Sequence, residues 1–141
     1  MPGLVANRVV VPFDYSDLSM EAVARGFDIV GDGGTVYIVH ILADLPAMEY
    51  GNLYGTVTDE SRIECSEKSL REKLSDPRFS AAIFHITVGD PGSEITKFAE
   101  SEKVDMIVMS SHGYGFVKHV LLGSVAERVV RLSHCPVLVL R

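Results

Sequence analysis

The chain has 141 residues, of which 47% are hydrophobic and 23% charged, and its formal net charge is −6. These values are those of a globular chain long enough for one domain with its own core, and they exclude a disordered chain. The acidic balance argues against nucleic acid as a general partner, because a phosphate backbone requires a basic surface. No apolar run approaches the roughly 20 residues of a membrane-spanning helix, and no basic, apolar leader begins the chain. We therefore expect a cytoplasmic protein with no membrane partner, in which Cys65 and Cys135 are reduced thiols.

The first 42 residues predict two strands with a helix between them. The run from Arg8 to Pro12 is short, rich in β-branched residues and apolar on both faces, which is typical of a strand buried in a parallel sheet. Ser16 and Asp17 can cap a helix that continues to about Val30. Residues 35–42 then form a second buried strand.

The middle of the chain predicts a loop, an exposed helix, a strand and a second amphipathic helix. Residues 43–57 show no period and are expected to form a long surface loop, whereas residues 58–75 carry a weak helical pattern with many charges. Residues 81–88 predict the third strand. Asp90 is placed to cap a helix over 91–102, with proline in the first helical position, where its missing N–H is harmless.

The last third of the chain predicts a strand at 105–109, a helix at 124–132 and a final strand at 136–140. Five strands that alternate with four helices imply a parallel sheet covered on both faces, because right-handed crossovers place helices there. No internal repeat or linker interrupts the pattern. We therefore expect residues 1–141 to form a single doubly wound, Rossmann-like α/β domain.

Ligands of such a sheet bind beyond the carboxyl ends of the strands, where the strand order reverses. After the fourth strand, Gly113 and Gly115 allow backbone amides to converge as an anion-binding nest. Gly123 and Ser124 then open a helix whose first N–H groups are unpaired and whose dipole favours a phosphate. Ser124 can either cap that helix or donate its hydroxyl to a phosphate. The alternative is that the glycines serve tight turns only, but their position between a buried strand and a helix favours the binding site.

The end of the first strand supplies a second group of candidates. Asp14 follows Pro12 at the sheet edge and can accept hydrogen bonds from ribose hydroxyls or from an adenine amino group. Alternatively, Asp14 joins Ser16 in capping the first helix, and the pattern favours neither interpretation. Ile41 can form an apolar wall for a base, or it can be ordinary core packing.

Catalytic and metal-binding patterns are weak. The chain lacks the GxxxxGK[ST] motif, which excludes a lysine-assisted ATPase or kinase of that type. His112 lies beside the glycine loop, where an acid–base role competes with that of a turn histidine. His40 and His85 fall within strands and are expected to be core or sheet-face residues. Residues 110–141 contain four basic residues and only one acidic residue. We expect this excess of positive charge to be a chance cluster of cations on a helix surface.

Several motifs together resemble one known family. Ser110-x2-Gly113-x9-Gly123-Ser124 is similar to the pattern G-x2-G-x9-G-[S/T] of nucleotide-binding universal stress proteins, and it leads into the strand CPVLVL. The P-x-D-x-S signature matches residues 12–16, and the G-D-P turn matches residues 89–91. The resemblance covers nearly the whole chain. It implies the strand order 3-2-1-4-5 and a homodimer formed through the last strand around Val139.

The resemblance also implies ATP or another adenine nucleotide as the ligand. Asp14 is a candidate to help hold Mg²⁺ through that nucleotide, but no carboxylate cluster in the sequence indicates a dedicated metal site. The expected binding positions are Pro12, Phe13, Asp14, Ile41, Gly89, Met109, Ser110, His112, Gly113, Gly115, Gly123, Ser124 and Val125. Ser110 departs from the family's first glycine, and its side chain either crowds the phosphate or adds a donor. The favoured function is that of a nucleotide-binding stress or regulatory protein with at most slow hydrolysis. The alternatives are a nucleotide-free dimeric interaction protein and an enzyme acting on a nucleotide α-phosphate.

Overall fold

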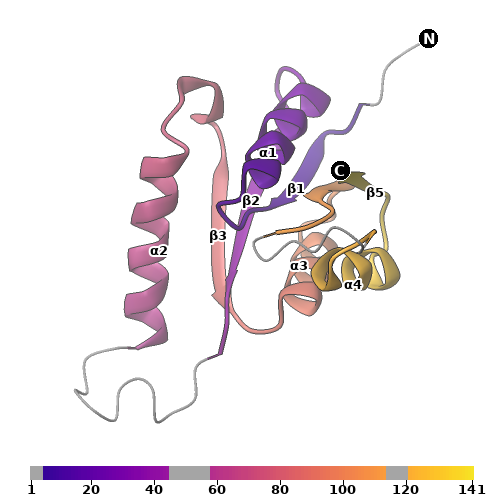
Figure 1. Cartoon of the computed structure of the whole chain (residues 1–141). Coiled ribbons are helices and arrows are strands. Elements are labelled where there is room, and N and C mark those ends of the chain that lie inside the picture. Colours follow the sequence, from indigo (N-terminus) through magenta and orange to yellow (C-terminus); the bar gives the residue numbers. More distant parts are fainter. Residues whose placement is uncertain (1–4, 45–57, 114–120) are drawn as a thin grey trace.

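The computed structural model describes residues 5–44, 58–113 and 121–141 of the chain. Five parallel strands form one sheet in the order β3-β2-β1-β4-β5, which confirms the predicted doubly wound α/β domain. The strands are β1 (Arg8–Pro12), β2 (Thr35–Leu42), β3 (Ile83–Val88), β4 (Met106–Ser110) and β5 (Val137–Leu140). The described residues also form the helices α1 (Asp17–Val30), α2 (Asp59–Lys73), α3 (Pro91–Ser101) and α4 (Ser124–Leu132). Figure 1 shows these elements along the chain.

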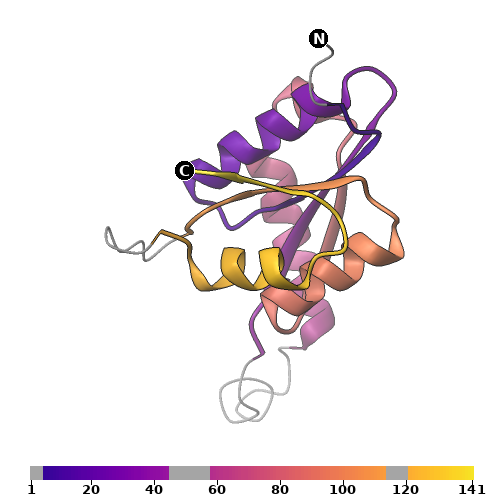
Figure 2. The same ribbon diagram turned by 90° about the vertical axis from the view of Figure 1, so that its right-hand side faces the viewer.

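The helices cover the sheet in two layers. Helices α1 and α2 pack on one face of the sheet, and α3 and α4 lie side by side on the other. Both Figure 1 and Figure 2 show this arrangement. Strand β1 lies at the centre of the sheet, and its side chains alternate between the two cores. Val9 and Val11 join the core under α1 and α2, whereas Val10 joins the core under α3 and α4, and all three are fully buried. The apolar character of both strand faces follows from this double covering.

The boundaries of β3, β4 and β5 differ by one or two residues from the prediction, and β5 begins at Val137. Strand β3 begins at Ile83 because a short 3₁₀ helix, Pro77–Phe79, precedes it and buries its phenylalanine. Strand β4 begins at Met106 because the Asp105 carboxylate accepts hydrogen bonds from the backbone N–H groups of Asn7 and Arg8, each at 2.9 Å. The predicted helix caps are confirmed for α1 and α3. Ser16 accepts from the N–H of Ser19, and Asp90 accepts from that of Ser93.

The predicted loop at 43–57 falls almost entirely outside the described residues. Within the part that is described, no helix combines the length and the apolar character needed to cross a membrane. Cys65 and Cys135 both have free thiols.

Candidate functional site

A cavity of about 500 Å³ lies at the carboxyl edge of the sheet. Its wall is built from the ends of β1, β2 and β4 and from the first turns of α3 and α4. Strands β1 and β4 are neighbours in the sheet, but the chain leaves them toward opposite faces, so this edge is the point where the strand order reverses. The lining residues are Pro12, Phe13, Asp14, Val39, His40, Ile41, Pro91, Ile95, Met109, Ser110, Ser111, His112, Gly113, Gly123, Ser124, Val125 and Ala126.

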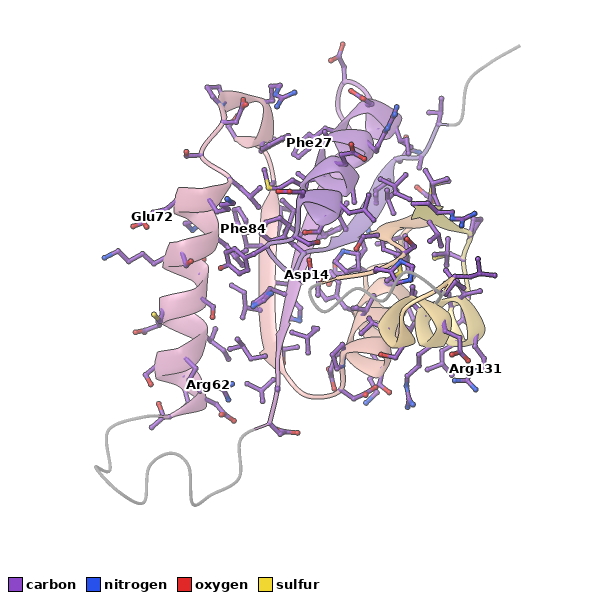
Figure 3. All side chains as sticks on the ribbon, viewed as in Figure 1. Asp14, Phe27, Arg62, Glu72, Phe84 and Arg131 are labelled. Carbon is purple, nitrogen blue, oxygen red and sulfur yellow. The ribbon has the colours of Figure 1, made fainter. Side chains whose placement is uncertain are left out.

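Asp14 contributes a negative charge to this largely apolar wall. Its Oδ1 accepts hydrogen bonds from the Ser16 backbone N–H at 3.0 Å and from the Ser16 hydroxyl at 2.5 Å. Its Oδ2 lies against Gly113, since a methyl group added to that glycine would overlap this oxygen. Asp14 is partly buried, whereas Figure 3 shows Glu72 and Arg131 extending from the outer faces of their helices. The two alternatives for Asp14 are therefore compatible, because one oxygen supports the start of α1 while the side chain still lines the cavity.

The segment after β4 is held at both ends. The Ser111 backbone N–H donates to Leu140 O of β5 at 2.7 Å, and Ser111 O accepts from Gly123 N, also at 2.7 Å. The second bond brings the first residues after β4 against the start of α4, and a Cβ on Gly123 would lie only 3.1 Å from Ser111 O. A glycine at this position therefore permits the close approach. In the same segment, His112 Nδ1 lies 3.0 Å from the Ser111 hydroxyl oxygen.

Helix α4 begins with its N-terminus toward the cavity. Gly123 occupies the N-cap position and has no side chain to accept from the first-turn N–H groups. The prediction that Ser124 can cap this helix is therefore wrong, because Ser124 is the first helical residue and not the capping one. Backbone N–H groups and the positive end of the helix dipole are the features that attract a phosphate. The hydroxyl of Ser124 stays available for its predicted role as a donor.

Helix α3 completes the cavity from the same side of the sheet. Pro91 and Ile95 line the wall, and Asp90 caps the helix just behind them. The Ser93 backbone N–H holds the pKa of Asp90 below its ordinary value of 3.8. Arg128 of α4 pairs with this carboxylate, with 3.1 Å between Arg128 Nε and Asp90 Oδ2. This bridge links the first turn of α3 to α4.

The structure brings most of the predicted positions together. Eleven of them line the cavity, and Gly89, which the structure also describes, does not. Gly89 lies in the turn between β3 and α3 with φ of 153°, where it donates to Leu42 O at 3.0 Å. Gly115 lies outside the described residues. The cavity therefore joins the two strand ends that the sequence pattern singled out.

Several lining residues were not predicted, namely Val39, His40, Pro91, Ile95, Ser111 and Ala126. His40 was interpreted as a core or sheet-face residue because it falls within the strand pattern of β2. Its place near the end of that strand was the signal that could have identified it, since the ends of the inner strands meet at the cavity. His85, on β3, stacks on Phe98 with 4.2 Å between the ring centres. Burial lowers its pKa, and it lies outside the cavity lining.

The basic residues of α4 do not form an anion site. Arg128 pairs with Asp90, Arg131 approaches Glu127 at 3.8 Å, and neither lines the cavity. The cations of this helix are therefore surface residues, as the sequence favoured. Among the described residues no group of three or more histidine, cysteine, aspartate or glutamate side chains is arranged to hold a metal ion.

Comparison with known proteins identifies relatives that share the sequence and the fold. Residues 6–141 match the model of the universal stress protein family. Universal stress protein MJ0531 of Methanocaldococcus jannaschii is 34% identical, over 96% of this chain and 82% of that protein. The solved structure of the hypothetical protein MJ0577 has a TM-score of 0.77 at 29% identity, covering 95% of this chain and 94% of the other.

A second solved structure is that of a universal stress protein in complex with cAMP. It has a TM-score of 0.62 at 28% identity and covers 97% of this chain and 98% of the other. The family match extends over β1 to β5 and so includes every strand end that builds the cavity. The chain belongs to the universal stress protein family.

Proposed function

We propose that the chain binds an adenine nucleotide in the cavity at the carboxyl ends of β1 and β4. The observation that carries the proposal is the arrangement of this cavity. The described residues that line it provide an apolar wall, one carboxylate and the N-terminus of α4. A volume of about 500 Å³ is within the usual range of small-molecule sites. The related protein solved with cAMP supports the choice of an adenine nucleotide.

Each part of the nucleotide has a matching part of the wall. Ile41, Val39 and Met109 offer apolar surface for the base. Asp14 is the carboxylate available to accept hydrogen bonds from ribose hydroxyls. The phosphate then lies toward Gly113 and the first turn of α4, where backbone N–H groups and the helix dipole favour an anion.

A dedicated magnesium site does not fit the described residues. Mg²⁺ prefers several oxygen ligands in octahedral geometry. Among the described residues, Asp14 is the only acidic side chain that lines the cavity, and they contain no metal-ligand cluster. We therefore propose binding through the nucleotide itself, with no step that depends on a protein-bound metal.

We further propose that the protein acts as a homodimeric regulatory module in the cytoplasm. Strand β5 forms one edge of the sheet, and Val137, Leu138, Val139 and Leu140 are each partly exposed. An apolar edge strand requires cover, and pairing with a second copy would supply it. The free thiols of Cys65 and Cys135 suit a reducing compartment. Light scattering after size-exclusion chromatography measures the mass, and a monomer at micromolar concentration would contradict the dimer.

Titration calorimetry and thermal shift with AMP, ADP, ATP and cAMP test the binding proposal. We expect at least one of them to bind and to raise the melting temperature, because a ligand that binds only the native state stabilises it. GMP and inorganic phosphate are the controls for the base and for the anion. If no adenine nucleotide stabilises the protein at millimolar concentration, the nucleotide-free dimer of the same fold becomes the better description.

A further inference from the structure

The turn that presents Asp14 to the cavity has an unusual backbone. Tyr15, directly after Asp14, has φ of 70°, in the left-handed region that side chains other than glycine rarely adopt. Such a conformation persists only where its surroundings hold it in place. The contacts that hold this turn therefore determine where the Asp14 carboxylate points.

One group of contacts is local to the turn and to the start of α1. Ser16 donates to Asp14 Oδ1 through its N–H and its hydroxyl, and the N–H of Asp14 approaches the Ser19 hydroxyl at 3.4 Å. These bonds fix the internal shape of the turn. The turn is joined to β2, whose end forms the neighbouring wall of the cavity, by the Phe13 N–H, which donates to Val39 O at 2.9 Å.

His40 of β2 supplies a contact across the strands. Its Nδ1 lies 2.7 Å from Phe13 O, and because a carbonyl oxygen only accepts, Nδ1 carries the proton. The same ring meets Tyr15 edge-on, with 5.4 Å between ring centres and planes at 86°. His40 therefore contacts the residues on both sides of Asp14 while also lining the cavity.

We propose that His40 is a positioning residue for the nucleotide site. Its hydrogen bond fixes the peptide group between Phe13 and Asp14, and its ring supports Tyr15 in the left-handed conformation. The Asp14 carboxylate is thereby held against Gly113, where it can meet the ligand. This role rests on the proposed nucleotide binding. It assigns to the site a residue that acts by positioning Asp14 and not by contact with the phosphate.

The test combines variants at His40 with removal of the Asp14 carboxylate. His40→Phe keeps a ring beside Tyr15 and removes the donor, so we expect affinity for AMP to fall about three- to tenfold, the equivalent of one hydrogen bond. His40→Asn restores a donor near the position of Nδ1 and should recover much of that loss. In an Asp14→Ala background, His40→Phe should cost no further affinity. Equal losses in both backgrounds, or no loss in either, would overturn the proposal.

A matched control and a second measurement keep the test decisive. His85→Phe changes a strand histidine outside the cavity lining and should leave the dissociation constant for AMP unchanged. If His40→Phe does not fold, nitrogen-15 NMR of the unliganded wild-type protein reports the His40 tautomer. We expect a protonated Nδ1, and an unprotonated Nδ1 would overturn the proposal. If the wild-type protein binds no adenine nucleotide, the proposed function fails and this role fails with it, whereas binding that is insensitive to His40 refutes the positioning role alone.

Discussion

Adding one methyl group at Gly113 tests the packing at the centre of the site. In Gly113→Ala the new Cβ would overlap Asp14 Oδ2, so the carboxylate or the segment after β4 must shift. That segment is tied at Ser111 to β5 and to the start of α4. We therefore expect the Asp14 carboxylate to move and to weaken its two hydrogen bonds from Ser16.

The expected size of the effect follows from those bonds. A hydrogen bond to a charged group contributes about 1.5–3 kcal/mol, and the lower end applies because Asp14 is partly exposed. We expect the free energy of unfolding to fall by about 1–2 kcal/mol, which lowers the melting temperature by about 3–6 °C in a chain of this size. Affinity for AMP should fall at least about tenfold, the equivalent of 1.4 kcal/mol.

Scanning calorimetry and titration calorimetry measure these two quantities. The control is the same substitution in an Asp14→Ala background, where the added methyl meets no carboxylate and should cost little further stability. Wild-type melting temperature and affinity in Gly113→Ala would refute the reasoning. An equal loss in both backgrounds would also refute it, because the clash would then lie elsewhere.

Three further substitutions have distinct expected outcomes. Gly123→Val places a branched side chain against Ser111 O and should abolish nucleotide binding while the dimer persists by light scattering; unchanged affinity would show that the phosphate lies elsewhere. Ser110→Gly restores the family's glycine and should keep or raise affinity in titration calorimetry, whereas a marked loss would identify the serine hydroxyl as a ligand. Asp90→Asn keeps a cap acceptor but removes the charge. Because the Ser93 N–H lowers the folded-state pKa of Asp90 below 3.8, its charge stabilises the fold above about pH 4, and this contribution is lost as the pH falls through the lowered value. The wild-type advantage in melting temperature should shrink accordingly between pH 5 and pH 3, and a constant difference would contradict this assignment.

The sequence predicted the fold well because its signals are local and agree with one another. Strand β1 is apolar on both faces because helices cover both, and Ser16 and Asp90 begin their helices through bonds to residues three positions ahead. The boundary of β4 was missed because the carboxylate of Asp105 reaches residues 97 and 98 positions earlier in the chain. No local pattern contains such a contact.

The candidate site was predicted in outline for the same reason. The strand ends and the glycines of the motif are readable from spacing, and most of them line one cavity. His40 was not assigned to the site because nothing in its strand pattern shows that its ring reaches Phe13, which directly follows the neighbouring strand β1. The position of Ser124 within α4 was also missed. A serine at the start of a helix resembles an N-cap in the sequence, although here Gly123 occupies the N-cap position.

A crystal structure of the protein grown with AMP tests the central claim most directly. We expect density for the base and ribose between Ile41 and Asp14, and density for the phosphate at Gly113 and the first turn of α4. The same cavity in protein purified without added ligand would show whether a nucleotide is carried from the cell. An empty cavity at saturating AMP, or AMP bound elsewhere on the surface, would contradict the account.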